Sequence, residues 1–448
     1  MRTFLLLILG LASCVHSANI LAVIPFSQTS HQILFKSVIV ELCERGHHVT
    51  YVSPYDYKEN ITNLEPIILS DYWAEQESSV FSSIPKSNDF SVLKILSSLT
   101  PAHILRMHEA MLSVGRSVLT DPKVVEIIKS DRHYDAVMSE SFFSQEWSAV
   151  FGHRFNAIRI VLSTFGSNAW VDEMSGFPDN PSYQVDSKFY KPRPPSNFVE
   201  RVVSLWNMVS YAGAGYYFLQ FRAQKMIDEV ARYPGWENRP RLTLMAADNA
   251  LLLLNTHVSL LGSAYPRAPH AKEVGGLNID FKMDLKSSKK LEDPKLKEVK
   301  KFLDESKDGF MFFSLGSVVT PSILPPKTFE KLYAAFSKLN FRVLMRWKGA
   351  AMPEKPAGNI LLTDKFLPQL EILSHENIKV FATHGGLLSI TEAIYFAIPI
   401  VGFPVFADQP SNMRKAKSRG YGTFLDVKGN LSESDIIEAV NEVLHNQS

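Results

Sequence analysis

The chain has 448 residues, of which 46% are hydrophobic and 21% are charged, and its formal net charge is +1. It is long enough to bury a large core and to form two domains. A net charge so close to zero, with no basic run, argues against nucleic acid as a partner.

Residues 1–17 predict a secretory signal sequence. Arg2 precedes an apolar run over residues 4–12, and Val15-His16-Ser17 provides a small-residue cleavage site. We expect cleavage near Ala18, after which the mature chain would be lumenal in the secretory pathway or secreted.

Cleavage there would leave Cys43 as the one remaining cysteine. A disulfide within the chain would then be impossible, and we expect Cys43 to be a buried free thiol. Asn60-Ile-Thr62 and Asn430-Leu-Ser432 fit the N-glycosylation pattern, and a third match, Asn446-Gln-Ser448, ends the chain.

The first predicted elements form a βαβ unit. Residues 19–26 predict a buried strand, residues 31–45 a helix with Gly46 at its C′ position, and residues 48–53 a second strand. The turn after the first strand lacks the G-x-G-x-x-G pattern, which argues against a dinucleotide cofactor. We therefore expect no cofactor.

His31 stands at the start of this helix, where a loop at the carboxyl edge of the sheet faces a crevice. An imidazole accepts a proton near neutral pH, so His31 is a candidate general base. Residues 134–140 predict a strand that ends in the carboxylate of Glu140. That carboxylate is either solvated at the strand end or part of a site.

The middle of the chain, from residue 63 to about residue 250, predicts helices such as residues 94–118 and 198–233. Residues 250–255 predict the last strand of the first domain. Three aromatic segments could line an acceptor pocket, but we interpret them as ordinary core: Trp170, Gly176–Tyr183 and Tyr211–Phe221.

A polar segment rich in Lys and Asp follows and predicts a linker. The predicted organisation is a first domain at 18–279, a linker at 280–305 and a second domain at 306–448. Strands of the second domain are predicted at residues 310–315, 342–347, 359–362 and 420–426.

Residues 366–409 are the most informative stretch. A strand ending at His384 is followed by Gly385 and Gly386, then by a helix over residues 387–398 and another strand. Glycines allow close approach of the backbone, and a helix N-terminus offers free N–H groups, so this turn predicts a phosphate site.

Polar side chains accompany that turn. We place Ser389 and Glu392 in the first turn of the helix, where they also match an S-x-x-E capping box, a structural role compatible with a functional one. Asp408 and Gln409 end the next βα connection. These groups, with His384, could all face one crevice at the carboxyl ends of the strands.

The stretch from Phe366 to Gln409 resembles the signature of the UDP-glycosyltransferases, and its HGGLLSxxE form resembles the invertebrate branch. The resemblance extends over nearly the whole chain. It implies an α/β GT-B fold, in which two Rossmann-like domains face each other across an interdomain cleft. It also implies a UDP-sugar as co-substrate and a small lipophilic acceptor.

The resemblance implies a role for each matching position. His31 would be the base, paired with Glu140. In the implied donor site, Phe366 stacks on uracil, with Gln369 beside it, and Glu392 binds the ribose. Asp408 and Gln409 bind the transferred sugar. The diphosphate is bound by Ser317, His384, Gly385, Gly386 and Ser389. Most relatives carry Trp where this chain has Phe366, so lower donor affinity is expected.

The implied reaction is transfer of a hexose with inversion, with glucose favoured over glucuronate. Neither a D-x-D spacing nor a Cys/His cluster suggests a metal. Two alternatives stay open: a non-catalytic protein that keeps the fold to bind a lipophilic ligand or partner, and a GT-B transferase acting on lipid or glycan. A homo-oligomer is possible.

Most animal members of this family continue with further helices, a membrane span and a basic tail, whereas this sequence ends at Ser448. A span needs about 20 largely apolar residues. The best stretch, residues 242–261, is interrupted by Asp248, Asn249, Asn255 and His257. We expect no transmembrane segment in this chain, less firmly docked domains and hence poor activity. The sequence is either a natural short form or an incomplete product.

Overall fold

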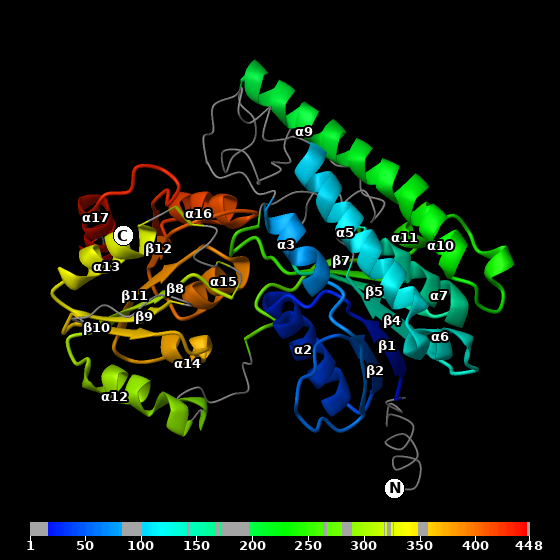
Figure 1. The fold of residues 1–448 in the computed structure, drawn as a ribbon, viewed down its shortest axis with the longest axis horizontal. Coiled ribbons are helices and arrows are strands. Elements are labelled where there is room, and N and C mark those ends of the chain that lie inside the picture. The colour runs from blue at the N-terminus through cyan, green and yellow to red at the C-terminus, as the bar shows by residue number, and fades with distance from the viewer. Residues whose placement is uncertain are drawn as a thin grey trace, which may run out of the picture.

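The chain forms two parallel β-sheets, each flanked by helices (Figure 1). The computed structural model describes residues 17–82, 101–140, 144–166, 171, 197–262, 267–279, 289–317, 319, 324–325, 327–347 and 357–445. Residues 1–16 of the predicted signal sequence, Trp170 and the segment 176–183 lie outside the described residues.

The first sheet has seven strands in the order β3-β2-β1-β4-β5-β6-β7, all parallel. The strands are β1 (Asn19–Val23), β2 (His48–Ser53), β3 (Leu64–Ile68), β4 (Ala136–Ser139), β5 (Ile158–Ser163), β6 (Leu251–Leu254) and β7 (Ala271–Glu273). The order reverses between β1 and β4, as in a doubly wound Rossmann-like sheet.

Helices pack on both faces of this sheet because the strands are apolar on both sides. In β1, Leu21 and Val23 face one core cluster, whereas Ile20 and Ala22 face the other. The helical segments are α2 (Thr29–Glu44), α3 (Ala74–Ser82), α5 (Pro101–Thr120), α6 (Pro122–Lys129), η1 (Gln145–Ser148), α7 (Ala149–Phe155), α9 (Phe198–Tyr217), η2 (Phe218–Ala223), α10 (Gln224–Val230), η3 (Trp236–Asn238) and α11 (Leu242–Ala247).

The second sheet has six parallel strands in the order β10-β9-β8-β11-β12-β13 and reverses between β8 and β11. Its strands are β8 (Phe310–Ser314), β9 (Arg342–Arg346), β10 (Ile360–Thr363), β11 (Ile378–Thr383), β12 (Ile400–Gly402) and β13 (Gly422–Phe424). Its helices are α12 (Lys297–Glu305), α13 (Thr328–Ser337), α14 (Gln369–Leu373), α15 (Leu387–Tyr395), α16 (Gln409–Ser418) and α17 (Glu433–His445), preceded by the short segments η5 (Lys289–Glu292) and η6 (Pro294–Leu296).

The predicted linker contains helix α12. Its residues Val299, Phe302 and Leu303 belong to the same apolar cluster as Phe310 and Phe312 of β8. The helix therefore packs on the second sheet, because its apolar positions recur at helical spacing and match one face of that sheet.

The long helix predicted over residues 198–233 is interrupted. A π-helical segment, η2, separates α9 from α10, and the helix ends at Val230. The prediction that Tyr211–Phe221 is ordinary core is wrong in part: Phe218 is buried, whereas Tyr216, Tyr217 and Phe221 are exposed.

Two local predictions in the first domain are confirmed. Gly46 ends α2 with φ at +89°, a conformation that glycine adopts without strain. Cys43 is a buried free thiol, and burial raises its pKa to about 11.

Segments that follow strands of the first sheet contact the second domain. Arg419 donates hydrogen bonds to the carbonyl oxygens of Val258, Leu260 and Gly262, and the Tyr421 hydroxyl donates to the Ser259 carbonyl at 2.9 Å. Leu261 belongs to an apolar cluster of the second domain. The two domains are thus joined by polar and apolar contacts.

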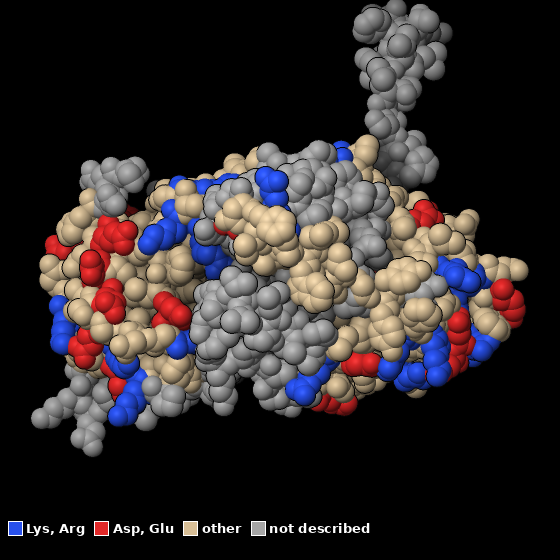
Figure 2. Space-filling view, turned by 90° about the horizontal axis from the view of Figure 1, so that it is seen from above, with Lys and Arg blue, Asp and Glu red and all other residues tan. Residues whose placement is uncertain are grey.

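Surface charge is mixed. On the face seen in Figure 2, Lys and Arg atoms are interspersed with Asp and Glu atoms, which accords with the net charge of +1.

Within the part of the chain that the structure describes, no helix combines the length and apolarity that crossing a membrane requires. The segment 242–261 folds instead as α11 and β6 with their connections.

Candidate active site

The polar residues singled out in the sequence follow strands at or next to the two reversal points of strand order. In the first sheet, His31 lies at the start of α2 after β1, and Glu140 directly follows β4. In the second sheet, Ser317 follows β8 and His384 follows β11. Crevices at such reversal points, beyond the carboxyl ends of the strands, are where open α/β sheets bind ligands.

His31 and Glu140 form a buried pair. Only 6% of His31 and 1% of Glu140 is exposed, which excludes a solvated carboxylate at the strand end. His31 Nδ1 lies 2.8 Å from one carboxylate oxygen of Glu140 and 3.0 Å from the other. Residues 109 positions apart meet because β1 and β4 are neighbours in the sheet.

Two further side chains hold the Glu140 carboxylate, and neither was identified from the sequence. The Thr164 hydroxyl donates to Glu140 at 2.5 Å and lies 3.0 Å from His31 Nδ1, and Gln145 Nε2 donates to the other carboxylate oxygen at 3.3 Å. Asn255 in turn donates to the Thr164 carbonyl at 3.1 Å. The sequence signal that could have identified Thr164 is its place as a polar residue directly after a buried strand, β5.

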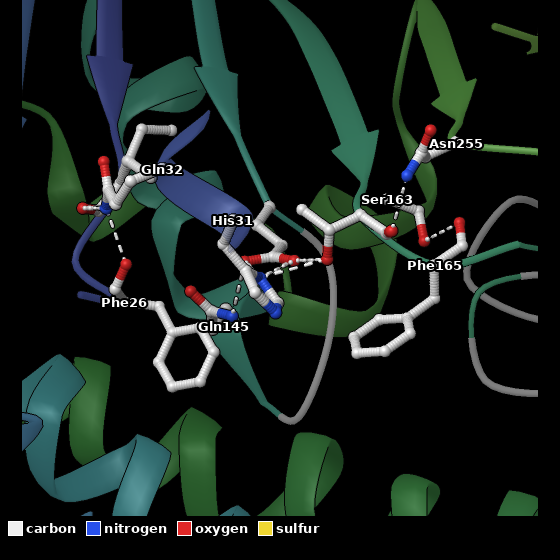
Figure 3. A network of polar contacts seen from close by, with 10 residues as sticks. Phe26, His31, Gln32, Gln145, Ser163, Phe165 and Asn255 are labelled. Carbon is white, nitrogen blue, oxygen red and sulfur yellow. Dashed lines mark hydrogen bonds and ion pairs between the residues drawn. The ribbon is translucent and has the colours of Figure 1, made fainter. Parts of the chain in front are cut away.

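The Glu140 carboxylate selects the imidazole tautomer. An ionised carboxylate only accepts hydrogen bonds, so the His31 proton resides on Nδ1 and Nε2 keeps its lone pair. Within the described part of the chain, the ring's hydrogen bonds are all made through Nδ1. The rings of Phe26 and Phe165 contact the His31 ring edge to face, with their centroids 4.6 and 5.5 Å from the centroid of the imidazole (Figure 3). The arrangement leaves Nε2 able to take a proton.

In the second domain, the His384 ring lies between two glycines. A Cβ placed on Gly316 would stand 2.6 Å from His384 Cε1, and one placed on Gly386 would stand 2.6 Å from its Nε2. Gly316 also has φ at +74°. Burial lowers the pKa of His384 to about 4, so the imidazole is neutral at physiological pH and presents one N–H donor and one acceptor.

A hydrogen-bonded chain connects the glycine turn to Asp408. Asn412 Nδ2 donates to the Gly385 carbonyl at 3.1 Å and to Asp408 Oδ2 at 2.6 Å. Gln409 is buried, and its Oε1 atom accepts hydrogen bonds from the backbone N–H groups of residues 405 and 406 at 2.9 and 3.2 Å. Its amide oxygen is thus occupied, and the structure shows no hydrogen bond from its amide nitrogen to another described residue.

Gln369, Ser389 and Glu392 meet in one polar cluster. Gln369 Nε2 donates to Glu392 Oε2 at 2.6 Å and to the Ser389 hydroxyl at 3.1 Å. Burial raises the pKa of Glu392 to about 7, against the lowering effect of its hydrogen bonds from Gln369 and Asn278. Further hydrogen-bond donors to this carboxylate would favour its ionised form.

The capping-box interpretation of Ser389 and Glu392 is wrong. Gly386 occupies the N-cap position of α15, so Ser389 is the third helical residue and Glu392, the sixth, lies in the second turn. The helix begins at Leu387, at the start of its predicted span, and both side chains bond to Gln369 instead of to the helix backbone.

Phe366 is 67% exposed in the loop before α14, although aromatic rings of this size are usually buried. Arg346 lies 5.8 Å from the Phe366 ring centre and donates to the carbonyls of Lys365 and Gly316 at 3.0 and 2.7 Å. It therefore ties the loop of Phe366 to the turn that holds the exposed Ser317, a link that the sequence analysis missed.

Nowhere in the described ranges do three or more His, Cys, Asp or Glu side chains come together as a possible metal site.

Fold comparison defines the class of protein. The chain superposes on the crystal structure of CalG4, the calicheamicin glycosyltransferase, with a TM-score of 0.56 at 15% sequence identity, covering 96% of this chain and 90% of that one. Together with the two parallel Rossmann-like sheets, this establishes a GT-B glycosyltransferase fold.

Sequence comparison identifies the family. The family model described as UDP-glucoronosyl and UDP-glucosyl transferase matches residues 19–448. The chain is 30% identical to UDP-glucosyltransferase 2 of Dactylopius coccus, covering 99% of this chain and 81% of that protein, and 28% identical to UDP-glucuronosyltransferase 1A7 of Rattus norvegicus, covering 99% and 79%. The chain belongs to this family of UDP-glycosyltransferases, enzymes that transfer sugar from a UDP-sugar to small acceptors.

Proposed function

We propose that this protein transfers a hexose, with glucose favoured over glucuronate, from a UDP-sugar to a hydroxyl of a small lipophilic acceptor with inversion. The observation that carries the proposal is the buried His31–Glu140 pair, whose tautomer leaves Nε2 of the imidazole free to accept a proton. Removal of a proton from an acceptor hydroxyl requires an oriented base of this kind, whereas ligand binding alone does not.

In the proposed step, the acceptor oxygen bonds to the anomeric carbon while the bond from that carbon to the UDP oxygen breaks. The acceptor proton passes to His31 Nε2, and Glu140 stabilises the imidazolium that forms, as a carboxylate does in a Ser-His-Asp triad. A single displacement of this kind inverts the anomeric carbon.

The second domain would hold the donor. We propose that Phe366 stacks on uracil beside Gln369, that Glu392 binds the ribose, and that Asp408 and Gln409 bind the sugar. The diphosphate would lie against Ser317, His384, Gly385, Gly386 and Ser389. The N–H groups at the start of α15 and the neutral His384 would stabilise the departing UDP through hydrogen bonds and the helix dipole.

Release of UDP tests this proposal. The purified chain is incubated with a phenolic acceptor and one donor in each of three parallel reactions: UDP-glucose, UDP-galactose or UDP-glucuronate. The anomeric configuration of the product is determined by NMR. We expect UDP release fastest with UDP-glucose and a β-linked product from that α-linked donor. A chain that binds UDP but releases none from any donor would be a non-catalytic binding protein, and a retained configuration would contradict the mechanism.

We also propose that residues 1–17 are removed and that the protein resides in the secretory pathway. The family match begins at residue 19, and both Asn60 and Asn430 are exposed, as glycosylation requires. In a eukaryotic secretory host we expect an N-terminus near Ala18 and a loss of mass on treatment with an N-glycosidase. An intact N-terminus on an unglycosylated chain would refute this localisation.

A further inference from the structure

The Glu392 carboxylate is bonded by both domains. Gln369 of the second domain donates to Oε2, and Asn278 of the first domain donates through Nδ2 to Oε1, each at 2.6 Å. Asn278 lies beyond β7 in the segment Gly275-Gly276-Leu277-Asn278, which approaches α15. A Cβ on Gly276 would come within 4.0 Å of the Thr391 side chain.

The second polar atom of Asn278 is unusual. Asn278 is 5% exposed, and its amide oxygen Oδ1 is buried without a hydrogen-bond partner among the described residues. A buried acceptor without a partner costs free energy, whereas the same atom is satisfied when a ligand offers an O–H donor. The unpaired oxygen belongs to the same amide group whose nitrogen holds Glu392.

We propose that Asn278 is a donor-positioning residue contributed by the first domain: it holds the Glu392 carboxylate and presents Oδ1 to a hydroxyl of the nucleoside. The proposal rests on the proposed function of Glu392 as the ribose-binding residue. It adds that the nucleoside site is completed across the domain interface, so that donor binding depends on the hydrogen bond between Asn278 and Glu392.

The charges around Glu392 give this role a pH signature. Of the neighbouring charged groups, Glu371 of α14 raises the pKa of Glu392, and Glu371 itself is paired with Lys290 at 3.1 Å. The hydrogen bond from Asn278 lowers that pKa. Removing Asn278 therefore raises the pKa of Glu392 further above its present value of about 7, and the ionised form, which accepts hydrogen bonds from hydroxyl groups, becomes scarcer at pH 7.

The test is UDP binding by calorimetry at pH 7.0 and 8.5 in the wild type, Asn278→Ala and Asn278→Asp, the last of which keeps the side-chain shape but loses the amide donor. We expect Asn278→Ala to weaken UDP binding about tenfold at pH 7.0, the scale of one hydrogen bond to a charged group. The loss should be smaller at pH 8.5 and smaller for 2′,3′-dideoxyuridine diphosphate, which lacks the ribose hydroxyls.

Tyr421→Phe is the matched control, because it removes another hydrogen bond between the domains, to the Ser259 carbonyl. It should leave UDP binding unchanged. If Asn278→Ala lost the same UDP affinity at both pH values, and Tyr421→Phe showed the same loss, the inference would be overturned. The contact of Asn278 with Glu392 would then be purely structural. Wild-type affinity in both Asn278 variants would also overturn the inference. Failure of the wild type to bind UDP at all would instead remove the proposed function and this inference with it.

Discussion

Replacing His31 by alanine should lower turnover by about 10²–10⁴-fold while UDP binding stays within about twofold, because general-base catalysis contributes that much and none of the proposed donor contacts is made by His31. Steady-state UDP release gives the turnover, and calorimetry with UDP gives the binding. The imidazole lost is the one whose Nδ1 is held 2.8 Å from Glu140.

In His31→Ala, a fall in turnover caused by unfolding must be distinguished from a fall caused by the missing base. Without His31, the buried Glu140 carboxylate keeps hydrogen bonds only from Thr164 and Gln145 among the residues that the structure describes, which destabilises the first domain. Thermal melting should therefore accompany the kinetics. His133→Ala is the matched control, since it removes an exposed imidazole 3.0 Å from Asp135 in the same domain. A folded His31→Ala protein with wild-type turnover would refute His31 as the base.

Replacing Gly316 by alanine should lower kcat/KM for the UDP-sugar by about 10²-fold, the cost of misplacing a binding group by roughly 1 Å. The new Cβ would stand 2.6 Å from His384 Cε1, and the ring has little room to retreat because Gly386 is packed so closely on its Nε2 side that a Cβ there would also stand 2.6 Å away. The left-handed φ of +74° at Gly316 adds backbone strain.

Gly358→Ala provides the matched control in the same domain. Nothing lies within 4 Å of a Cβ placed there, so this change should leave both stability and donor affinity unaltered. In Gly316→Ala we expect UDP affinity to fall while the second domain still folds, because the steric conflict is confined to one imidazole. Unchanged UDP affinity in Gly316→Ala would show that His384 takes no part in donor binding.

Elements with a strong local pattern were predictable from the sequence. The βαβ opening, the parallel strands of the second domain and the helix after His384 appear close to their predicted positions, because buried strands and amphipathic helices carry their periodicity in neighbouring residues. Element ends were less predictable. The start of α15 was predicted at Leu387, but the capping-box role of Ser389 and Glu392 was wrong, because the N-cap is decided by which backbone and side chains it contacts, not by the S-x-x-E pattern alone.

The meeting of His31 with Glu140 was expected from the family resemblance, and the structure places the two in contact. The assignments of the donor-site positions remain predictions. By contrast, Thr164 and Gln145 have no local pattern that marks them as partners of Glu140. They reach it because β5 lies beside β4 and because η1 follows the same strand end.

The sequence by itself thus determined the fold class, the family and the candidate base, since these depend on periodicity and on a contiguous signature. Only the tertiary structure decided which side chains support those groups. Asn278 and Glu392 are 114 positions apart and belong to different domains. Their contact depends on how two separately packed sheets meet, and that geometry arises from contacts between surfaces that no local stretch of sequence encodes.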